Sequence, residues 1–262
     1  MITVSETGIF ALTNAHFSYV FRISPEGILE HLHYGGPLDD PHEMAVHHFR
    51  TQREATVNFQ GHPHYNLSDT PQEYPVFGTT DYRFPAFHGR NADGNTVFSF
   101  RYKSYRLSSE KPRLESLPSA RGGASATLIV TLEDPLHHLE AELYYTVYEN
   151  YGVLVRSARL INTGPDEIEL QHVFSSALDL PPDDYEILHL HGTWAREFNA
   201  ERIDVPAGRF VIDSARGSSS AAHNPFTAIV QKGTNEAHGR VYAAALTASR
   251  GNNPSLRPSI VV

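Results

Sequence analysis

The feature that most constrains the fold is the recurrence of short apolar segments separated by turn residues. Apolar and polar residues alternate through residues 139–148, and the side chains expected on the buried side are Leu139, Ala141, Leu143, Tyr145 and Val147. A period of two is typical of a strand with one buried face. Further strands are expected at 9–12, 17–23, 29–34, 96–107, 128–132, 153–162, 168–176, 210–213, 226–230 and 241–246. Because no segment shows a convincing amphipathic helical period, the pattern predicts an all-β sandwich of many antiparallel strands with little helix.

The turn signals between these segments are specific in places. Asp93-Gly94 lies at the centre of the stretch 91–95, and Gly after Asp accepts the positive φ that a tight turn requires. We therefore expect a hairpin here, with 96–107 as its returning strand.

Composition excludes several classes of partner. The chain has 262 residues, of which 40% are hydrophobic and 19% charged, so it has enough apolar residues for a sizeable core. A formal net charge of -9 argues against nucleic acid or an anionic membrane as a partner. The chain contains no cysteine, which excludes disulfides and thiolate metal sites, and no stretch resembles a signal peptide or a membrane span. These features favour a cytoplasmic protein.

Two stretches lack the alternating pattern. Residues 38–72 are rich in Asp, His, Asn and Pro, and a loop of this length in a globular domain is often functional. Residues 73–87 follow with mixed aromatic, proline and charged residues. Asp81 and Arg83 are two positions apart, so an extended chain places both on one side. The segment is interpreted either as an ordered, non-repetitive loop held by an ion pair or as a rim that contacts sugar.

Acidic and histidine pairs offer little catalytic signal. Hydrolysis of a glycosidic bond uses two carboxylates, but the pairs Asp39-Asp40 and Asp183-Asp184 adjoin proline, where Asp is an ordinary turn residue. Histidines recur as pairs at 31/33, 47/48, 62/64, 137/138 and 189/191. A His-x-His pair on a strand places both rings on one face, as metal sites do, yet no third ligand is evident. We expect hydrogen-bonded histidines and no metal or cofactor.

The segments 192–197 and 216–226 contain residue types that can bind a sugar or act as a nucleophile. Trp194 is the one tryptophan of the chain, and it either belongs to the core or stacks on a sugar beside Arg196. The small-residue loop 216–226 contains serines but lacks the G-x-S-x-G setting of a hydrolase nucleophile.

An ordered set of motifs resembles the N-terminal domain of glycoside hydrolase family 36 α-galactosidases over about residues 10–246. The strongest is Glu73 to Ala86, which matches the family run E-Y-P-x-F/Y-G-x-x-D-Y/F-R-x-P-A nearly throughout. The others are Gly35-Gly36, Lys111-Pro112-Arg113-Leu114, Leu117-Pro118, Arg156-Ser157, Leu178-Asp179-Leu180-Pro181, Asp184-Tyr185, Gly192 to Glu197, Arg216-Gly217 to Phe226 and Gly239-Arg240-Val241-Tyr242.

The resemblance implies a β-supersandwich of the galactose-mutarotase type over residues 1–246. In the family, a following TIM barrel carries the two catalytic aspartates, so no catalytic residue is expected in this chain and it should be inactive alone. Residues 247–262 depart from the family pattern and are expected to form a divergent tail. The family's His-Gln pair before N-P-F is also replaced, here by Ala221-Ala222.

In the family, the long loop after the third strand reaches a substrate pocket, often that of a neighbouring subunit. By position, we expect substrate contacts from Asp39, Asp40, Arg50 and Arg53, and from Trp194. The implied partners are an α-galactoside or galactose-type sugar and further copies of the full-length protein. Two rival functions stay open: a stand-alone carbohydrate-binding module and a mutarotase-like epimerase.

Overall fold

Strands and turns make up nearly all of the regular structure, as the alternating sequence segments predict. The computed structural model describes residues 1–47, 65–112, 123, 125–214, 222–246 and 259–262. Their contacts form two compact units, the first ending at Asp179 and the second beginning at Leu180. The division into a domain over 1–246 and a tail over 247–262 stays a prediction, and residues 247–258 lie outside the described residues.

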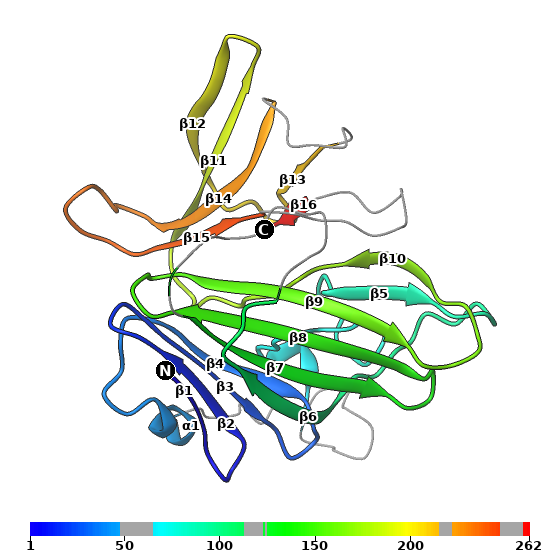
Figure 1. Cartoon of the computed structure of the whole chain (residues 1–262). Helices are drawn as coiled ribbons and strands as arrows, with labels where there is room; N and C mark the ends of the chain where they lie inside the picture. Colours follow the sequence, from blue (N-terminus) through cyan, green and yellow to red (C-terminus); the bar gives the residue numbers. More distant parts are fainter. Residues whose placement is uncertain (48–64, 113–122, 124, 215–221, 247–258) are drawn as a thin grey trace. The chain divides into compact units, whose positions relative to one another are not determined.

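Unit 1 contains two four-stranded antiparallel sheets and a two-stranded one (Figure 1). The first sheet, in the order β1-β2-β3-β4, consists of β1 (Ile2–Val4), β2 (Ile9–Thr13), β3 (Ser18–Ile23) and β4 (Leu29–Gly35). The second, in the order β6-β7-β8-β9, consists of β6 (Arg101–Ser108), β7 (Ser125–Asp134), β8 (Leu139–Tyr148) and β9 (Leu154–Asn162). The small sheet pairs β5 (Phe87–Arg90) with β10 (Glu169–Val173).

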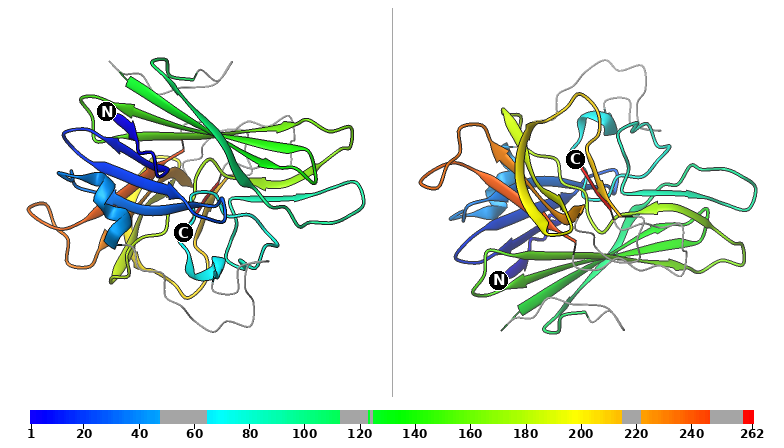
Figure 2. Two further views of the ribbon diagram at one scale, coloured as in Figure 1. Left: turned by 90° about the horizontal axis from the view of Figure 1, so that it is seen from below. Right: turned by 90° about the horizontal axis from the view of Figure 1, so that it is seen from above.

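The core of unit 1 lies between the two larger sheets, drawn in blue and green in Figures 1 and 2. Phe21 of β3 stacks on Tyr145 of β8 with ring centroids 4.9 Å apart, and Phe10 of β2 stacks on Phe21 at 4.8 Å. The five side chains predicted to share the inner face of β8 are all buried. The predicted all-β sandwich is therefore confirmed.

Unit 2 is built on a four-stranded antiparallel sheet in the order β12-β11-β14-β15. Its strands are β11 (Tyr185–Thr193), β12 (Arg196–Asp204), β14 (His223–Gln231) and β15 (Val241–Ala245). A short second pair joins β13 (Val211–Asp213) to β16 (Ser259–Val261).

Two local expectations are corrected. The turn at 91–95 forms, with Gly94 at φ +86°. The strand after it begins only at Arg101, and the strands on the two sides of the turn, β5 and β6, do not pair with each other as a hairpin. Instead β5 pairs with β10 and β6 pairs with β7. The sequence pattern also missed β12, because its residues are exposed on both faces and show no apolar alternation.

Helical structure in the described residues is limited to three short pieces, consistent with the prediction of little helix. They are η1 (Pro41–Glu43), α1 (Met44–His47) and η2 (Leu67–Asp69). None of the helices in the described part of the chain has the length and apolar character needed to cross a membrane.

Candidate functional site: the segment 72–87 and its two polar centres

The segment 72–87 is an ordered loop closed by its own backbone, as predicted. The amide of Ala86 donates to the carbonyl of Pro75 at 2.8 Å, and the amide of Phe77 donates to the carbonyl of Phe87 at 3.2 Å. Gly78 turns the loop at φ +100°, where a Cβ would lie 2.9 Å from Cγ2 of Val97. Only glycine meets both demands without strain.

The first polar centre is the buried carboxylate of Glu73. The hydroxyl of Tyr19 donates to both of its oxygens at 2.8 Å, and the hydroxyl of Tyr145 donates to Oε2 at 2.9 Å. Nδ1 of His31 lies 2.8 Å from Oε1, and Nη1 of Arg156 donates to Oε2 at 3.0 Å. These four partners come from β3, β8, β4 and β9, so one carboxylate connects both large sheets of unit 1.

The ionised form of Glu73 is the stable one. Burial on its own raises the pKa of a carboxyl group. Here the charge of Arg156, together with hydrogen bonds from His31 and Tyr19, outweighs burial and holds the pKa of Glu73 below its ordinary value. A fully buried carboxylate with this many donors is fixed in place and is not available as a general acid.

Arg156 is the cation of this centre. Its guanidinium carbon lies 3.8 Å from the centroid of the Tyr145 ring, a cation–π contact, and Nη1 also donates to the hydroxyl of Tyr19 at 2.8 Å. Nε and Nη2 of Arg156 are buried without a hydrogen-bond partner in the described part of the chain. The positive charge is therefore held mainly by Glu73 and the two tyrosine rings.

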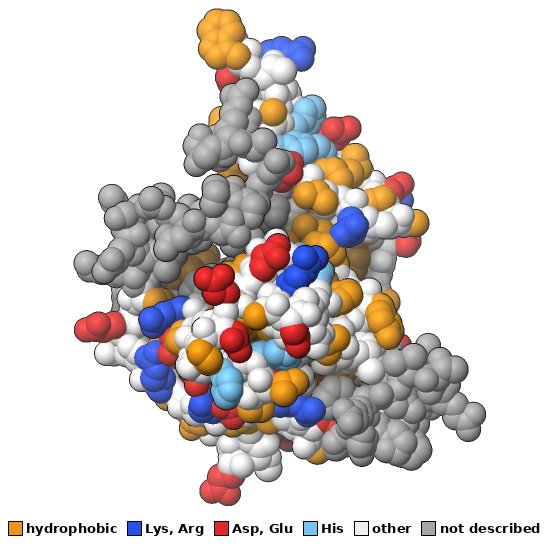
Figure 3. All heavy atoms as spheres, turned by 90° about the vertical axis from the view of Figure 1, so that its right-hand side faces the viewer, with side chains coloured by type: hydrophobic (Ala, Val, Ile, Leu, Met, Phe, Trp, Pro, Cys, Tyr) orange, Lys and Arg blue, Asp and Glu red, His pale blue; other side chains and the backbone are white. Residues whose placement is uncertain are grey.

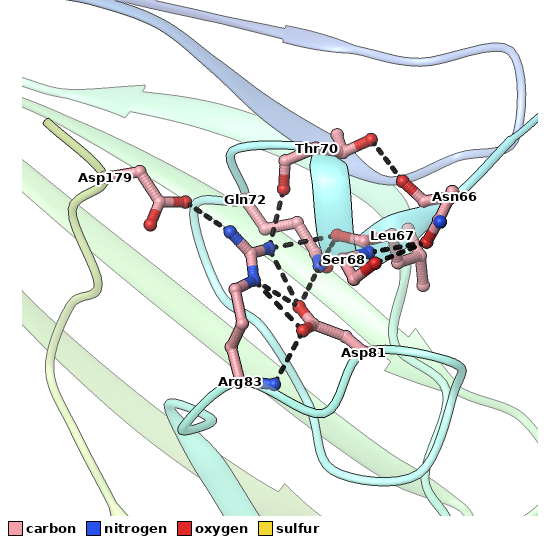
Figure 4. A network of polar contacts seen from close by, with 8 residues as sticks. All are labelled: Asn66, Leu67, Ser68, Thr70, Gln72, Asp81, Arg83 and Asp179. Atoms are coloured by element: carbon pink, nitrogen blue, oxygen red, sulfur yellow. Dashed lines mark hydrogen bonds and ion pairs between the residues drawn. The ribbon is translucent and has the colours of Figure 1, made fainter. Parts of the chain in front are cut away.

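The second polar centre joins Asp81 and Arg83 (Figure 4). Nε and Nη2 of Arg83 donate to the Asp81 carboxylate at 3.0 and 2.9 Å, which confirms the predicted ion pair. Nη2 also donates to the carbonyls of Leu67 and Thr70, at 3.0 and 2.7 Å, while Nη1 donates to Asp179 at 3.1 Å. Burial lowers the pKa of Arg83, but its bonds to Asp81 and the charge of Asp179 outweigh this and raise it.

Arg83 thereby joins three separate parts of unit 1. One is the end of the long irregular segment at residues 67–70, another is its own loop, and the third is Asp179 at the last position of the unit. Asp81 is 2% exposed and also accepts from Nε2 of Gln72 at 2.7 Å. The fork of five guanidinium donors suits a position that must hold several acceptors at once.

The remaining histidine and acidic pairs behave as hydrogen-bonded or turn residues where the structure describes them. His137 contacts Asp134 at 2.9 Å, and Asp183 accepts from Gln231 at 2.7 Å. Among the described residues, no group of three or more His, Asp or Glu side chains is arranged to hold a metal ion. His48, the pair 62/64 and the serine loop up to residue 221 lie outside the described residues.

The predicted substrate-contacting residues fall in both units. Asp39 and Asp40 are exposed in unit 1, and Asp40 accepts from the amide of His42 at 3.0 Å to cap η1. Arg50 and Arg53 lie outside the described residues. Trp194 is at the turn between β11 and β12 in unit 2 and is 90% exposed, so the interpretation of a core tryptophan is wrong. Substrate contact by any of them stays a prediction.

The Glu73 centre was not found by sequence reasoning. Glu73 and Arg156 both occur in the motifs that carry the resemblance, but 83 positions separate them. Nothing in a single sequence shows that such distant residues pair, and Tyr19 and Tyr145 look like ordinary strand aromatics.

Charge on the described surface is mixed. On the face drawn in Figure 3, acidic and basic side chains are interspersed among apolar ones. This face gives no support to a phosphate-binding patch, which needs clustered Lys and Arg.

Comparison with known proteins gives a consistent result. The sequence profile of the glycosyl hydrolase family 36 N-terminal domain matches residues 27–252. Alpha-galactosidase AgaA of Geobacillus stearothermophilus is 36% identical over 245 residues, which are 90% of this chain and 33% of AgaA. Alpha-galactosidase Mel36A of Lactobacillus acidophilus is 36% identical over 254 residues, 94% of this chain and 34% of Mel36A. The chain spans about a third of the length of the curated relatives it matches.

Solved structures agree with the sequence matches. The α-galactosidase AgaB of Geobacillus stearothermophilus superposes with a TM-score of 0.86 at 36% identity, covering 93% of this chain and 34% of AgaB. A variant of AgaA from the same organism, solved in complex with raffinose, superposes with a TM-score of 0.84 at 36% identity, covering 90% of this chain and 33% of AgaA. The same fold is thus seen at the same level of identity in enzymes about three times as long.

Proposed function

The chain belongs to the glycosyl hydrolase family 36 N-terminal domain family, and we propose that it serves as the non-catalytic part of an enzyme that hydrolyses terminal α-galactosides. The observation that carries this proposal is the extent of the match. At least 90% of this chain corresponds to a third of enzymes named as α-galactosidases. Raffinose and stachyose are bound in structures of AgaA variants, so oligosaccharides of this type are the proposed substrates of the parent enzyme.

The described carboxylates support a non-catalytic role. A glycosidase needs one carboxyl group with a raised pKa and a second one nearby. The buried carboxyl groups of Glu73 and Asp81 instead form ion pairs with Arg156 and Arg83. We assign the chemistry of the parent enzyme to its catalytic barrel, where the resemblance places both aspartates.

The proposed role of this chain is to pack against the catalytic barrel, to help the parent enzyme form oligomers and to supply loop residues to the substrate pocket. Asp39, Asp40, Arg50, Arg53 and Trp194 are the proposed substrate contacts, and the exposed side chains of Asp39, Asp40 and Trp194 are available to a partner. We also propose that the parent forms homo-oligomers. The absence of cysteine supports a cytoplasmic location for this function.

A graft tests the proposal. The corresponding third of AgaA is replaced by this chain, and raffinose hydrolysis is compared with that of AgaA lacking the segment. We expect the graft to restore hydrolysis and the oligomeric state seen for intact AgaA. A graft that folds, as judged by circular dichroism, yet hydrolyses no raffinose would contradict the proposal.

A second candidate, a carbohydrate-binding module, is favoured by one surface of unit 1. Tyr82 is 74% exposed and Phe84 is 39% exposed, and both flank Arg83 in the sequence. Aromatic rings beside charged hydrogen-bonding groups are suited to sugar rings. Calorimetric titration with galactose and raffinose should show saturable binding that Tyr82→Ala abolishes and Tyr151→Ala, at a 54% exposed aromatic elsewhere, leaves unchanged. No heat of binding up to millimolar sugar would exclude this candidate.

A further inference from the structure

Four titratable side chains gather on one face of the β12-β11-β14 sheet in unit 2. His189 and His191 are two positions apart on β11 and therefore share a face. Glu201 of β12 is directly opposite His189, and His223 of β14 is directly opposite His191. The ring of His189 has its centroid 5.4 Å from that of His191 and 5.7 Å from that of His223.

The carboxylate of Glu201 lies close to two of the three imidazole rings, those of His189 and His191. Oε2 of Glu201 lies 3.5 Å from Nε2 of His189 and 3.2 Å from Nε2 of His191. The side chain of His189 is 7% exposed and packs on the ring of Phe210, with centroids 4.9 Å apart. Glu201 is half-exposed, so its charge is partly screened by water.

The surroundings of Nδ1, the ring nitrogen of His189 that is not near Glu201, favour the neutral form of the ring. Nδ1 is buried, and no hydrogen-bond partner for it exists among the described residues. In a neutral ring with its proton on Nε2, the nitrogen nearer Glu201, Nδ1 carries a lone pair and tolerates this position. In the protonated ring Nδ1 becomes a donor without an acceptor, and burying an unsatisfied donor of a charged group is costly.

Burial and the two neighbouring imidazoles together outweigh the charge of Glu201 at His189. Burial comes first in lowering its pKa, and His223 and His191 lower it further, while Glu201 raises it. Glu201, His191 and His223 are the described charged groups that act on this ring, and the facing residue of β14, Thr227, is uncharged. The pKa of His189 lies below its ordinary value as a result.

We infer that His189, His191, His223 and Glu201 form an acid-sensitive latch that holds the β11–β12 hairpin onto β14. The latch is closed while the buried ring of His189 is neutral. At mildly acidic pH the open hairpin accepts protons more readily than the closed one, so acid favours opening. The hairpin ends at the exposed side chain of Trp194, which places a surface element under control of pH. The latch is a property of this fold and does not rest on the proposed function.

The direction of the pH dependence follows from the coupling between proton binding to His189 and opening of the hairpin. A histidine whose pKa is depressed in the closed state contributes stability that is present above its ordinary pKa and is lost as pH falls. The window begins near pH ~6.5, the ordinary value for histidine, and extends downward. Uptake of one proton on opening changes the opening equilibrium by at most roughly tenfold per pH unit, and the slope ends at the lowered pKa of closed His189.

Hydrogen exchange of the purified chain between pH 8 and pH 5 tests the latch, with rates corrected for the intrinsic pH dependence of exchange. We expect the protection of β11 and β12 amides to fall below pH ~6.5, by at most roughly tenfold per pH unit, while that of β15 and of β8 in unit 1 is maintained. Constant protection of β11 and β12 would overturn the inference. An equal loss in β15 would also overturn it, because acid would then be unfolding the whole sheet.

Three variants sharpen this test. His189→Gln keeps a polar amide near Glu201 but cannot take up the proton, so most of the loss of protection below pH ~6.5 should disappear. Glu201→Gln removes the charge that favours protonated His189, and the ratio of protection between pH 8 and pH 5 should grow. Because Glu201 is half-exposed, this variant stays informative even when His189→Gln does not fold. The control, His16→Gln at an exposed turn of unit 1, should behave as wild type, and a Glu201→Gln ratio equal to wild type contradicts the latch.

Discussion

The two units of this chain differ in how deeply their paired carboxylates are buried and in how many partners those carboxylates have. In unit 1, Glu73 is fully buried, and the partners that satisfy it come from both large sheets. In unit 2, Glu201 is half-exposed and contacts two imidazoles at 3.2 and 3.5 Å. A buried carboxylate with four partners fixes one arrangement of the strands around it, whereas a half-exposed carboxylate with two partners leaves the strands easier to separate.

The apolar cores differ in the same sense. Unit 1 has a continuous core in which twenty buried side chains pack together in the described residues. Among the described residues of unit 2, the buried apolar side chains are Ile187, Ile212, Ala228 and Val230. Because stability scales with the apolar area removed from water, unit 2 should be the weaker of the two. A low free energy of local opening in unit 2 allows the small effect of protonating one histidine to change how often the β11–β12 hairpin opens.

The largest expected effect comes from breaking the Glu73 centre. Arg156→Ala leaves a buried carboxylate without its cation and should cost unit 1 about 3–5 kcal/mol. The free energy of unfolding is measured from urea-dependent hydrogen exchange of β8 amides. Arg106→Ala, which removes an exposed ion pair with Glu142, is the matched control and should cost ~0–1 kcal/mol. Equal losses for the two variants would show that the buried centre does not hold unit 1 together.

Cavities in the two cores test whether the units are stabilised separately. Leu143→Ala removes a fully buried side chain from unit 1 and should cost about 2–5 kcal/mol there. Ile187→Ala, also fully buried, should cost unit 2 a similar amount and abolish most of its smaller stability. Urea titrations followed by exchange in β8 and β11 distinguish the two. Loss of β8 protection in Ile187→Ala would mean that the units unfold together.

A smaller loss is expected from the Arg83 centre. Arg83→Lys keeps the charge but loses the fork that reaches Asp81, Leu67 and Thr70 together, so unit 1 should lose about 1–2 kcal/mol. Exchange of the amides in 67–83 should report the change. Arg90→Lys serves as control, because its contact with Glu169 is 3.9 Å long and exposed. A control that loses as much as Arg83→Lys would remove the distinction between the two arginines.

The smallest expected effect is the loss of stability in mild acid, which should occur in unit 2 at a higher pH than in unit 1. The pKa of Glu73 is lowered, so its contribution is present above the ordinary glutamate value of ~4.3 and is lost only as pH falls further. The pKa of His189 is lowered from a higher starting value, so unit 2 should weaken from pH ~6.5 downward. At pH 5.5 exchange should therefore rise in β11 and not in β8, and the reverse order would contradict this account.

Much of unit 1 could be predicted from sequence, because its strands bury one face and the alternation of β8 is visible in the residues themselves. The ion pair of Asp81 and Arg83 was also predictable, since two positions along an extended chain share a side. The strand β12 was not, because both of its faces are exposed. Of the two interpretations of Trp194, the core position is wrong, since hydrophobicity favours burial but cannot reveal that the residue occupies a hairpin turn.

The polar centres show a second limit of sequence reasoning. The bond between Glu73 and Arg156 depends on how two sheets pack, and the His cluster depends on the register of β11 against β14. Neither register nor packing partner is encoded in local spacing. Single motifs therefore indicated where the important residues are but not which of them meet.

We propose that this chain supports the hydrolysis of α-galactosides by a parent enzyme without carrying the chemistry itself. The most direct test of this claim is the release of nitrophenol from a chromogenic α-galactoside by the purified chain, measured against a buffer blank. We predict no turnover above the blank, because the resemblance places both catalytic aspartates in a TIM barrel and the buried carboxyl groups of Glu73 and Asp81 are each paired with an arginine. Turnover that survives repurification and disappears when a single Asp or Glu of this chain is replaced would contradict the claim and place a catalytic carboxylate within the chain.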